Sequence, residues 1–337
     1  MLKVAIIGLG GMGRGHLNVY MRLMSEGYPL EVVAVCDINE KVFERLDIET
    51  NLDEFKDVKV DFSKLHKYTN VDDLLANEEL DVVSIATPTF EHSSVAIKCL
   101  KAGVNVLSEK PMGINPTVCQ LMIDTAKKNN VRLMIGQCLR FQGNYCYVKE
   151  CIEKGTHGKL LGAYMWRGGV RPATQWFFNR EKGGGASFDQ HIHDTDMVNW
   201  LFGLPKAVQS VGVNFIEGSG IDAISTNYIY DDNVMVNTHN RWIDFGTGFK
   251  AGYRFTFEKA TIISEKGDMK VYRDGQDITP EYDRTSAYYN EIKAFCDAVK
   301  DDTPIPEKNT PEQSLNTIRL ALAEIESCEK NGAIVTL

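Results

Sequence analysis

Apolar runs alternate with helical periodicity along the first 137 residues of the chain. Residues 3–8, KVAIIG, are a continuous run of β-branched and small apolar residues, as expected for a strand that is buried on both faces. Residues 30–37, LEVVAVCD, form a second run of this kind. Between these runs, apolar residues recur at helical spacing at Leu17, Tyr20, Met21 and Met24. The predicted order is therefore strand, helix, strand.

The same alternation continues to residue 137. Further strands are predicted at 80–89, 104–111 and 131–137, and helices at 90–103 and 116–130. Strands that alternate with helices form a parallel sheet with helices on both faces. We therefore expect a doubly wound α/β domain of the Rossmann type over residues 1–137. In such sheets, ligands bind outside the carboxyl ends of the strands.

Beyond residue 137 the pattern changes. Helices are predicted at 142–155, 286–300 and 311–330. Segments rich in β-branched and aromatic residues follow one another without intervening helices at 159–167, 206–216, 222–230, 233–243, 249–257, 260–265 and 268–273. The last two make a hairpin that turns near Gly267. We expect a second α/β domain, residues 138–337, with a mostly antiparallel sheet that forms a substrate wall and a subunit contact.

A glycine-rich turn follows the first strand and opens the first helix. It reads Gly8, Leu9, Gly10, Gly11, Met12 and Gly13, the spacing G-x-G-x-x-G. The first glycine permits a tight turn, the second lets a pyrophosphate approach the backbone, and the third lets helix and strand pack closely. Free N–H groups at the helix start favour phosphate. The context of strand, turn and helix predicts a dinucleotide site.

An acidic residue, Asp37, ends the second strand, about 24 positions after the last of these glycines. Its carboxylate is placed to accept hydrogen bonds from the adenine ribose hydroxyls. A 2′-phosphate there would meet a negative charge, and Ile38 offers no compensating cation. NAD is therefore favoured over NADP, although Lys41 and Arg45 lie nearby in the sequence.

Two more polar pairs fall at predicted strand ends. They are Thr87-Pro88 and Glu109-Lys110, followed by Pro111. All carboxyl ends of a parallel sheet meet at one edge, so we expect these residues beside the glycine turn. A lysine near a nicotinamide can hydrogen-bond a substrate hydroxyl and stabilise negative charge that develops on it. A cis bond before Pro111 would aim that side chain.

The segment FDQHIHDTDMVNW, residues 188–200, carries two histidines and three aspartates between Asp189 and Asp196. On a helix that begins near Asp189, the side chains of Asp189, His193 and Asp196 share one face, while Val198 and Leu201 face the core. Asp189 can then orient the His193 ring and leave its other nitrogen as a proton acceptor. The preceding glycines, 183–185, allow a ligand to approach the backbone closely.

A metal site is an alternative for this segment. His191, His193, Asp194 and Asp196 are all possible zinc ligands. Residues two apart on a helix point in different directions, however, so the two histidines cannot share one ion. No second cluster of His or Cys accompanies them, so we expect no metal. A purely structural, hydrogen-bonded helix end is a further alternative.

Composition and charge exclude several other classes of protein. The formal net charge of −9 and the lack of a basic run argue against a nucleic-acid partner. The eight cysteines form no C-x-x-C pair and are expected to be reduced thiols in the cytoplasm. No window reaches about 18 uninterrupted apolar residues, and no signal peptide is evident, so no membrane contact is expected.

Five motifs, in this order, resemble the family of glucose–fructose oxidoreductase and inositol dehydrogenase, known as Gfo/Idh/MocA. They are GLGGMGRGH at 8–16, ATPTFEH at 86–92, SEKPMG at 108–113, LRFQGNY at 139–145 and GGGASFDQHIHD at 183–194. The resemblance implies a Rossmann domain followed by an α/β domain with an open antiparallel sheet. It also implies a homodimer or homotetramer.

The resemblance also implies roles for single residues. Lys110 matches the lysine that polarises the substrate hydroxyl, and His193 and Asp189 match the catalytic histidine and its carboxylate partner. His92 belongs to a motif expected to contact the cofactor. Four residues are expected at the substrate: Arg140, Trp176, His191 and Tyr288. His191 departs from the family pattern, which often has glycine there, and its bulkier imidazole is expected to narrow the pocket or contact the substrate.

These features predict an NAD-dependent dehydrogenase that oxidises a secondary alcohol of a sugar, inositol or related polyol. Two alternatives remain. One is an enzyme that retains NAD and cleaves glycosidic bonds through transient oxidation. The other is a non-catalytic sugar sensor that binds NAD. The presence of both Lys110 and the pair of Asp189 and His193 favours catalysis, since a sensor needs no proton acceptor.

Overall fold

The structure, a computed structural model, describes residues 1–44, 62–172, 174–265 and 267–337. The chain divides into two compact units. The first contains residues 1–138 and 286–314, and the second contains residues 139–285 and 315–337. The sequence predicted a single division at 137/138, so the difference is the segment 286–314, which returns to the first unit.

The first unit is built on a six-stranded parallel sheet with strand order β3-β2-β1-β4-β5-β6. The strands are β1 (Leu2–Ile7), β2 (Leu30–Cys36), β3 (His66–Tyr68), β4 (Val82–Ile85), β5 (Asn105–Glu109) and β6 (Leu133–Gly136). The helices are α1 (Gly11–Ser25), α2 (Val71–Asn77), α3 (Thr89–Lys101), α4 (Pro116–Lys128) and α7 (Ala287–Lys300). The predicted Rossmann fold is confirmed.

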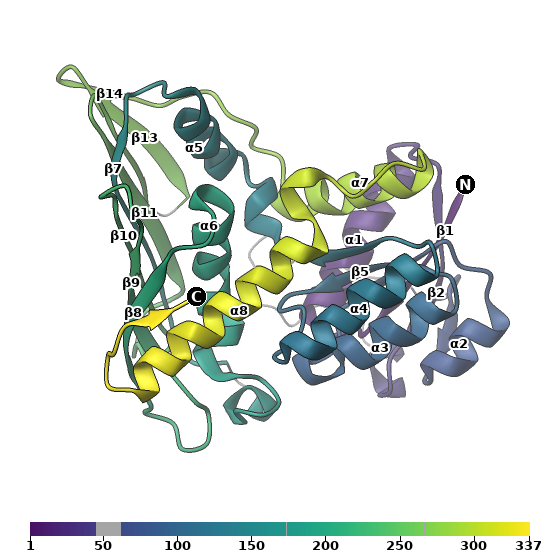
Figure 1. The fold of residues 1–337 in the computed structure, drawn as a ribbon. Helices are drawn as coiled ribbons and strands as arrows, with labels where there is room; N and C mark the ends of the chain where they lie inside the picture. Colours follow the sequence, from purple (N-terminus) through teal and green to yellow (C-terminus); the bar gives the residue numbers. More distant parts are fainter. Residues whose placement is uncertain (45–61, 173, 266) are drawn as a thin grey trace. The chain divides into compact units, whose positions relative to one another are not determined.

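Helices cover both faces of this sheet, as the apolar runs predicted. Helix α1 packs with α7, while α2, α3 and α4 pack together (Figure 1). This division follows from the strand order, because right-handed crossovers toward β2 and toward β5 place their helices on opposite faces. Apart from β3, the strands between them are almost fully buried, so they read as continuous apolar sequence.

Strand β3 and helix α2 were not predicted from the sequence. The strand has only three residues, His66, Lys67 and Tyr68, and it lies at the edge of the sheet. Its side chains are largely exposed and therefore polar, so no hydrophobic pattern marks it. Helix α2 has a single buried residue, Leu74, and begins at an Asn70 cap.

The second unit is built on a nine-stranded sheet with order β14-β13-β12-β11-β7-β10-β9-β8-β15. Neighbouring strands are antiparallel except β7 and β10, so the prediction of a mostly antiparallel sheet is confirmed. Its strands are β7 (Leu160–Gly168), β8 (Ala207–Val213), β9 (Ala223–Ile229), β10 (Met235–Arg241), β11 (Lys250–Phe257), β12 (Thr261–Glu265), β13 (Asp268–Arg273), β14 (Gln276–Ile278) and β15 (Val335–Thr336).

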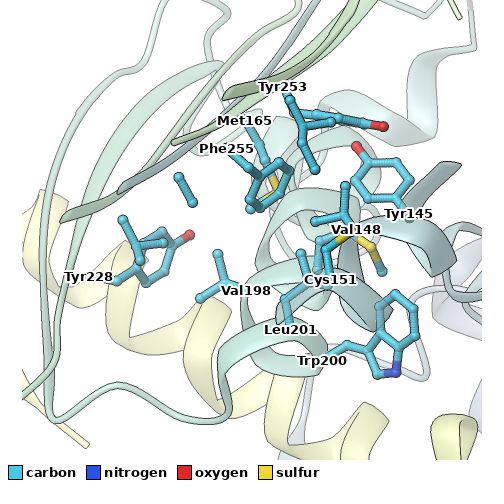
Figure 2. Close-up of a cluster of buried hydrophobic side chains, with 14 of the residues drawn as sticks. Tyr145, Val148, Cys151, Met165, Val198, Trp200, Leu201, Tyr228, Tyr253 and Phe255 are labelled. Carbon is cyan, nitrogen blue, oxygen red and sulfur yellow. The ribbon is translucent and has the colours of Figure 1, made fainter. Parts of the chain in front are cut away.

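Three helices lie on one face of this sheet: α5 (Gly143–Lys154), α6 (Ile192–Phe202) and α8 (Pro311–Glu329), whose first turn belongs to the first unit (Figure 1). The core between helices and sheet is apolar and aromatic (Figure 2). Val198 and Leu201 of α6 lie in it, as the helical spacing predicted. Phe255 of β11 is fully buried there, with its ring 5.1 Å from that of Tyr253.

The segment that precedes α6 differs from the sequence prediction. A helix was expected to begin near Asp189, but α6 begins at Ile192 and residues Ser187–His191 form a π-helical turn. A π turn holds more residues than an α turn, so side-chain directions shift relative to simple i, i+4 spacing. Asp189 and His193 are half-buried, whereas Asp196 is only 1% exposed, so the three do not share one environment.

None of the helices in the described ranges is both long and apolar enough to cross a membrane. All eight cysteines are thiols that form no disulfide bond, and six of them are buried. They serve as small apolar side chains in the cores of the two units.

Candidate functional site

The glycine turn of the first unit has the geometry that the motif predicted. Gly8 has a φ of +88°, and a Cβ there would lie 2.6 Å from the Ala86 carbonyl oxygen. A Cβ on Gly13 would lie 1.7 Å from the Gly8 carbonyl oxygen. At Gly10, which caps α1, the Cβ position has no atom within 4 Å. Two glycines therefore permit close packing, and the third leaves the backbone open to a ligand.

Asp37 follows β2, and its carboxylate contacts the backbone of this turn. Its Oδ2 accepts a hydrogen bond from the Leu9 backbone N–H at 2.7 Å, and its Oδ1 accepts one from Asn39 at 2.9 Å. The carboxylate is partly exposed. Each oxygen keeps a further lone pair for a hydroxyl donor, as the predicted ribose contact needs. Ile38 is 90% exposed, and the side chain of Lys41 is exposed, while Arg45 lies outside the described residues.

The carboxyl end of β5 carries Glu109 and Lys110. The Lys110–Pro111 peptide is cis, as the sequence suggested. Glu109 is buried, and its Oε1 lies 2.9 Å from His16 Nε2 on α1. Its Oε2 accepts a hydrogen bond from the Lys110 backbone N–H at 3.1 Å. Burial alone would raise the pKa of Glu109, but His16 and the Lys110 charge outweigh it and leave that pKa lowered.

The carboxyl ends of β4 and β5 are linked by His92. Its Nε2 lies 2.8 Å from the Thr87 carbonyl oxygen, and its Nδ1 lies 2.8 Å from the Pro111 carbonyl oxygen. The ring is buried, and burial lowers the pKa of His92 although the two carbonyls oppose this. His92 therefore holds the loops of Thr87-Pro88 and Lys110-Pro111 together through backbone contacts.

Tyr288 of α7 joins the same part of the first unit. Its ring centroid lies 6.4 Å from that of His16. Burial, with Cys138 and Glu109 nearby, raises the pKa of Tyr288 well above its ordinary value. The structure thus brings together Gly8–Gly13, Asp37, Thr87-Pro88, His92, Glu109, Lys110 and Tyr288 within one unit.

In the second unit, buried ion pairs hold the helix that carries His193. Asp196 accepts two hydrogen bonds from Arg140, at 2.8 and 2.7 Å, and Asp194 accepts two from Arg167, at 2.9 and 2.8 Å. Arg140 is 0% exposed, and Asp194 is 0% exposed. Two-point pairs of this kind fix orientation as well as charge. The assignment of Arg140 to substrate stays a prediction, and its guanidinium is engaged with Asp196.

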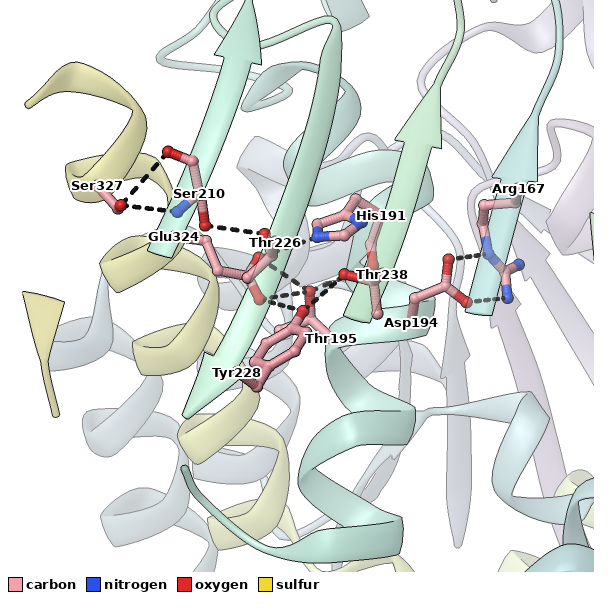
Figure 3. Close-up of polar contacts among 10 residues, drawn as sticks. All are labelled: Arg167, His191, Asp194, Thr195, Ser210, Thr226, Tyr228, Thr238, Glu324 and Ser327. Atoms are coloured by element: carbon pink, nitrogen blue, oxygen red, sulfur yellow. Dashed lines mark hydrogen bonds and ion pairs between the residues drawn. The ribbon is translucent and has the colours of Figure 1, made fainter. Parts of the chain in front are cut away.

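His191 is also buried inside the second unit. Its Nε2 lies 3.1 Å from Glu324 Oε2 on α8, and neither side chain has exposed surface (Figure 3). Glu324 accepts hydrogen bonds from Tyr228, at 2.6 Å, and from Thr195, at 3.1 Å. The expected substrate contact of His191 stays a prediction. The observed contacts anchor the π turn to α8.

The glycines before the π turn pack against their own chain. A Cβ on Gly183 would lie 2.8 Å from Phe177 Cα, and one on Gly185 would lie 2.5 Å from the Ser219 carbonyl oxygen. Trp176 stacks on the Phe177 ring at 3.8 Å and is partly exposed. These glycines are therefore required by local packing, which places Trp176 beside the segment that leads to Asp189.

The proposed metal ligands are already engaged. Asp194 and Asp196 each bind an arginine, and His191 binds Glu324. Within the described ranges, no group of three or more His, Cys, Asp or Glu side chains is arranged to hold a metal ion.

The first unit fits a dinucleotide. Gly10 leaves an unobstructed backbone at the start of α1, where free N–H groups favour phosphate. Asp37 presents carboxylate oxygens at the end of the neighbouring strand. Comparison with known families agrees with this geometry. Residues 2–137 match an oxidoreductase family with an NAD-binding Rossmann fold, and residues 145–268 match the GFO/IDH/MocA C-terminal domain.

The chain belongs to the Gfo/Idh/MocA family.

Individual Gfo/Idh/MocA relatives differ in activity. A 2,7-anhydro-N-acetylneuraminate hydratase of Mediterraneibacter gnavus is 29% identical over 239 residues, which cover 67% of this chain and 59% of the relative. An inositol 2-dehydrogenase of Salmonella typhimurium is 30% identical over 221 residues, which cover 65% of this chain and 60% of the relative. Both matches thus span less than two thirds of the relative.

Among solved structures, the WlbA dehydrogenase of Bordetella pertussis, in complex with NADH and UDP-GlcNAcA, has a TM-score of 0.81. It is 20% identical in sequence, and the match covers 100% of this chain and 98% of that one. At this identity the likeness shows the fold of the Gfo/Idh/MocA family.

Several residues of this Gfo/Idh/MocA member were not singled out from the sequence. His16, Ser84 and Glu324 are fully buried polar residues within apolar stretches, and the available signal was a polar residue on a buried helix face or in a buried strand. The partners of Asp194 and Asp196 could not be identified, because Arg167 and Arg140 come from distant segments.

Replacement of Gly10 and of Gly13 by alanine should separate ligand approach from packing. Gly10→Ala leaves folding intact but weakens NADH binding about tenfold or more, because its methyl group meets only the incoming pyrophosphate. Gly13→Ala lowers thermal stability as well, because its Cβ meets the Gly8 carbonyl. Fluorescence titration with NADH and thermal unfolding measure the two effects. Equal losses of stability in both variants would contradict this assignment.

Removal of the Asp196 charge should destabilise the fold. Asp196→Asn leaves the Arg140 guanidinium buried without its counter-charge, which costs about 3–5 kcal/mol. Asp277→Asn is the matched control, since Asp277 pairs with Lys270 at the surface and its removal should change stability far less. Urea unfolding measures both. A similar loss in the two variants would rule out a special role for the buried pair.

Proposed function

We propose that this protein is an NAD-dependent dehydrogenase that oxidises a secondary alcohol of a sugar, inositol or related polyol. The observation that carries the proposal is the position of Lys110 at the carboxyl end of β5. The glycine turn and Asp37 lie at the ends of β1 and β2 in the same parallel sheet. A cation is thus presented at the edge where a dinucleotide binds.

The chain itself would supply binding and proton transfer. Gly8–Gly13 and the start of α1 hold the pyrophosphate, and Asp37 holds the adenine ribose. The bound nicotinamide supplies the hydride acceptor. Lys110 donates a hydrogen bond to the substrate hydroxyl and stabilises the negative charge that develops on its oxygen.

His193 is the proposed proton acceptor for the same hydroxyl, with Asp189 as the carboxylate that orients its ring. Removal of the proton raises electron density at the carbinol carbon and allows the hydride to leave. The π turn and the two buried Asp–Arg pairs support this assignment, because they fix the helix on which His193 lies. The proposed substrate residues remain Trp176, His191, Arg140 and Tyr288.

Preference for NAD over NADP is part of the proposal. Asp37 keeps free lone pairs for ribose hydroxyls, and the neighbouring Ile38 offers no charge to a 2′-phosphate. We further propose a cytoplasmic homodimer or homotetramer. Eight cysteines without a disulfide bond fit a reducing compartment. The nine-stranded sheet exposes Tyr164, Met235 and Tyr272, which we propose as a surface for subunit contact.

A redox-neutral reaction is the second candidate. The observation that favours it is the 29% identity to a hydratase, an enzyme named for the addition of water rather than for net oxidation. Such an enzyme would use the same Lys110 and His193 without net formation of NADH. The chain is 30% identical to an inositol 2-dehydrogenase over a similar span, so sequence identity does not separate a dehydrogenase from a hydratase. A screen of substrates must distinguish the two activities.

Screening of inositols, aldoses and sugar acids for formation of NADH tests the main proposal. Lys110→Ala should reduce kcat at least 100-fold while the affinity for NADH stays within about threefold, because the lysine acts on the hydroxyl and not on the pyrophosphate. Lys101→Ala, an exposed lysine at the end of α3, is the control. Loss of NADH binding without a change in kcat would refute the assigned role. Consumption of a substrate without NADH would support the second candidate.

Asp37→Ala should change coenzyme preference. Loss of the carboxylate removes the repulsion of a 2′-phosphate together with the ribose hydrogen bonds. We expect the ratio of kcat/KM for NAD to that for NADP to fall about tenfold or more. Steady-state kinetics with both coenzymes measure this ratio. An unchanged ratio would contradict the ribose contact.

A further inference from the structure

We propose that His16 is a positioning residue for Lys110, and that it acts through Glu109. His16 lies on α1, one turn beyond the glycine turn, whereas Lys110 follows β5. The functional part of this inference rests on the proposed role of Lys110. The structural part, the anchoring of the Lys110 peptide, stands on contacts within the first unit.

The contacts form a continuous chain between the helix and the peptide of Lys110. The hydroxyl of Ser84 on β4 lies 2.7 Å from His16 Nδ1, and Glu109 Oε1 lies 2.9 Å from His16 Nε2. The other carboxylate oxygen of Glu109 accepts the Lys110 N–H at 3.1 Å. The imidazole is therefore held at one nitrogen by the central sheet and presents the other nitrogen to Glu109.

Glu109 has little room to take another position. A Cβ on Gly136 of the adjacent strand β6 would lie only 3.3 Å from Glu109 Oε1, so that side of the carboxylate is closely packed. Glu109 is 5% exposed and His16 is 0% exposed. The carboxylate thus bridges α1 and the Lys110 backbone inside the protein, and solvent cannot replace either contact without structural change.

Stability alone does not account for this arrangement. A buried ion pair gains little over apolar packing of similar volume, because both charges lose their hydration. Tyr20, which lies one turn further along the same face of α1, is fully buried, and so is Leu17 beside His16, so an apolar residue would suit the site. The pair has another consequence: it makes the position of the Lys110 peptide depend on α1, the helix whose first turn faces the phosphates.

Two amide substitutions separate the hydrogen bond from the volume of the ring. In His16→Gln the side-chain amide ends near the position of Nε2 and can still donate to Glu109. In His16→Asn the amide ends near the position of Nδ1 and reaches only toward Ser84. Thr125→Val is the matched control, because it removes a buried hydroxyl of α4 that donates to the Leu121 carbonyl of the same helix.

The first measurement is hydrogen exchange at the Lys110 amide, resolved to the single residue, in protein without cofactor or substrate. The N–H that exchanges is the donor to Glu109, so the rate reports on the anchor itself. We expect about tenfold or faster exchange in His16→Asn, near wild-type exchange in His16→Gln, and no change in Thr125→Val. Glu109→Gln weakens the acceptor of the Lys110 N–H, so the Lys110 amide should also exchange faster in this variant. Glu109→Gln replaces His16→Asn in the test if His16→Asn does not fold.

The second measurement is turnover with whichever polyol the screen identifies. Positioning through Glu109 predicts that kcat falls about tenfold or more in His16→Asn and is largely retained in His16→Gln. KM for NAD should stay within about threefold in both. Because Asn is one methylene smaller than Gln, the test of packing is Glu109→Gln, which keeps the volume of residue 109 and weakens only its acceptor. Positioning through Glu109 predicts a similar fall in kcat in Glu109→Gln, whereas a role of His16 in packing alone predicts none.

The proposal is overturned if His16→Asn and His16→Gln exchange alike at Lys110, or if neither differs from the wild type. It is also overturned if exchange responds as expected while kcat does not. Failure of the wild-type protein to turn over any polyol would contradict the proposed function instead, and the exchange pattern would then decide the anchoring by itself.

Discussion

The contact between the Gly13 Cα and the Gly8 carbonyl determines the arrangement of the first unit. With only 1.7 Å between that oxygen and the position of a Cβ, no side chain fits at residue 13, and α1 therefore lies directly against the end of β1. The same closeness brings His16, one turn further along, within hydrogen-bonding distance of Ser84 and Glu109. The absence of a side chain at Gly13 thus determines the geometry of the glycine turn and the contacts of His16 with Ser84 and Glu109.

In the second unit, buried polar contacts fix the position of a helix. The helix that carries His193 has few apolar contacts to spare near its start, because Asp194, Thr195 and Asp196 are all buried there. Arginines on β7 and near the start of α5, with Glu324 of α8, satisfy these polar groups. Charges that are paired at two points resist rotation of a helix in a way that apolar contacts do not. We regard this rigidity as the main contribution of the second unit to the proposed chemistry.

Most of the fold could be predicted from the sequence, and the reasons are physical. Strands such as 3–8 and 30–37 are buried on both faces, so their apolar runs are unambiguous, and Gly155 ends its helix in a left-handed conformation at φ +61°. The exceptions were elements without a burial signal, such as β3, and the return of 286–314 to the first unit. That return depends on contacts such as Tyr28 with Asp297, which are distant in the sequence.

The site was predictable to the extent that its residues follow strand ends. Asp37 and Lys110 were found in this way, because the topology of a parallel sheet brings strand ends together. The roles of Arg140 and His191 could not be judged, because their partners, Asp196 and Glu324, lie 56 and more than 100 residues away. The sequence also offered no sign that helical spacing would fail at Ser187–His191.

That π turn accommodates one residue more than an α-helix would. A π turn closes its hydrogen bonds one residue later than an α turn, so the extra residue adds little net rotation. Deletion of one residue from Ser187–His191 would therefore convert the turn to α geometry and leave the helix on either side in place. Asp194 and Asp196 would keep their arginines, while the side chains inside the turn, Asp189 among them, would change direction. A change of one residue in length here thus acts on the direction of Asp189 more than on the fold.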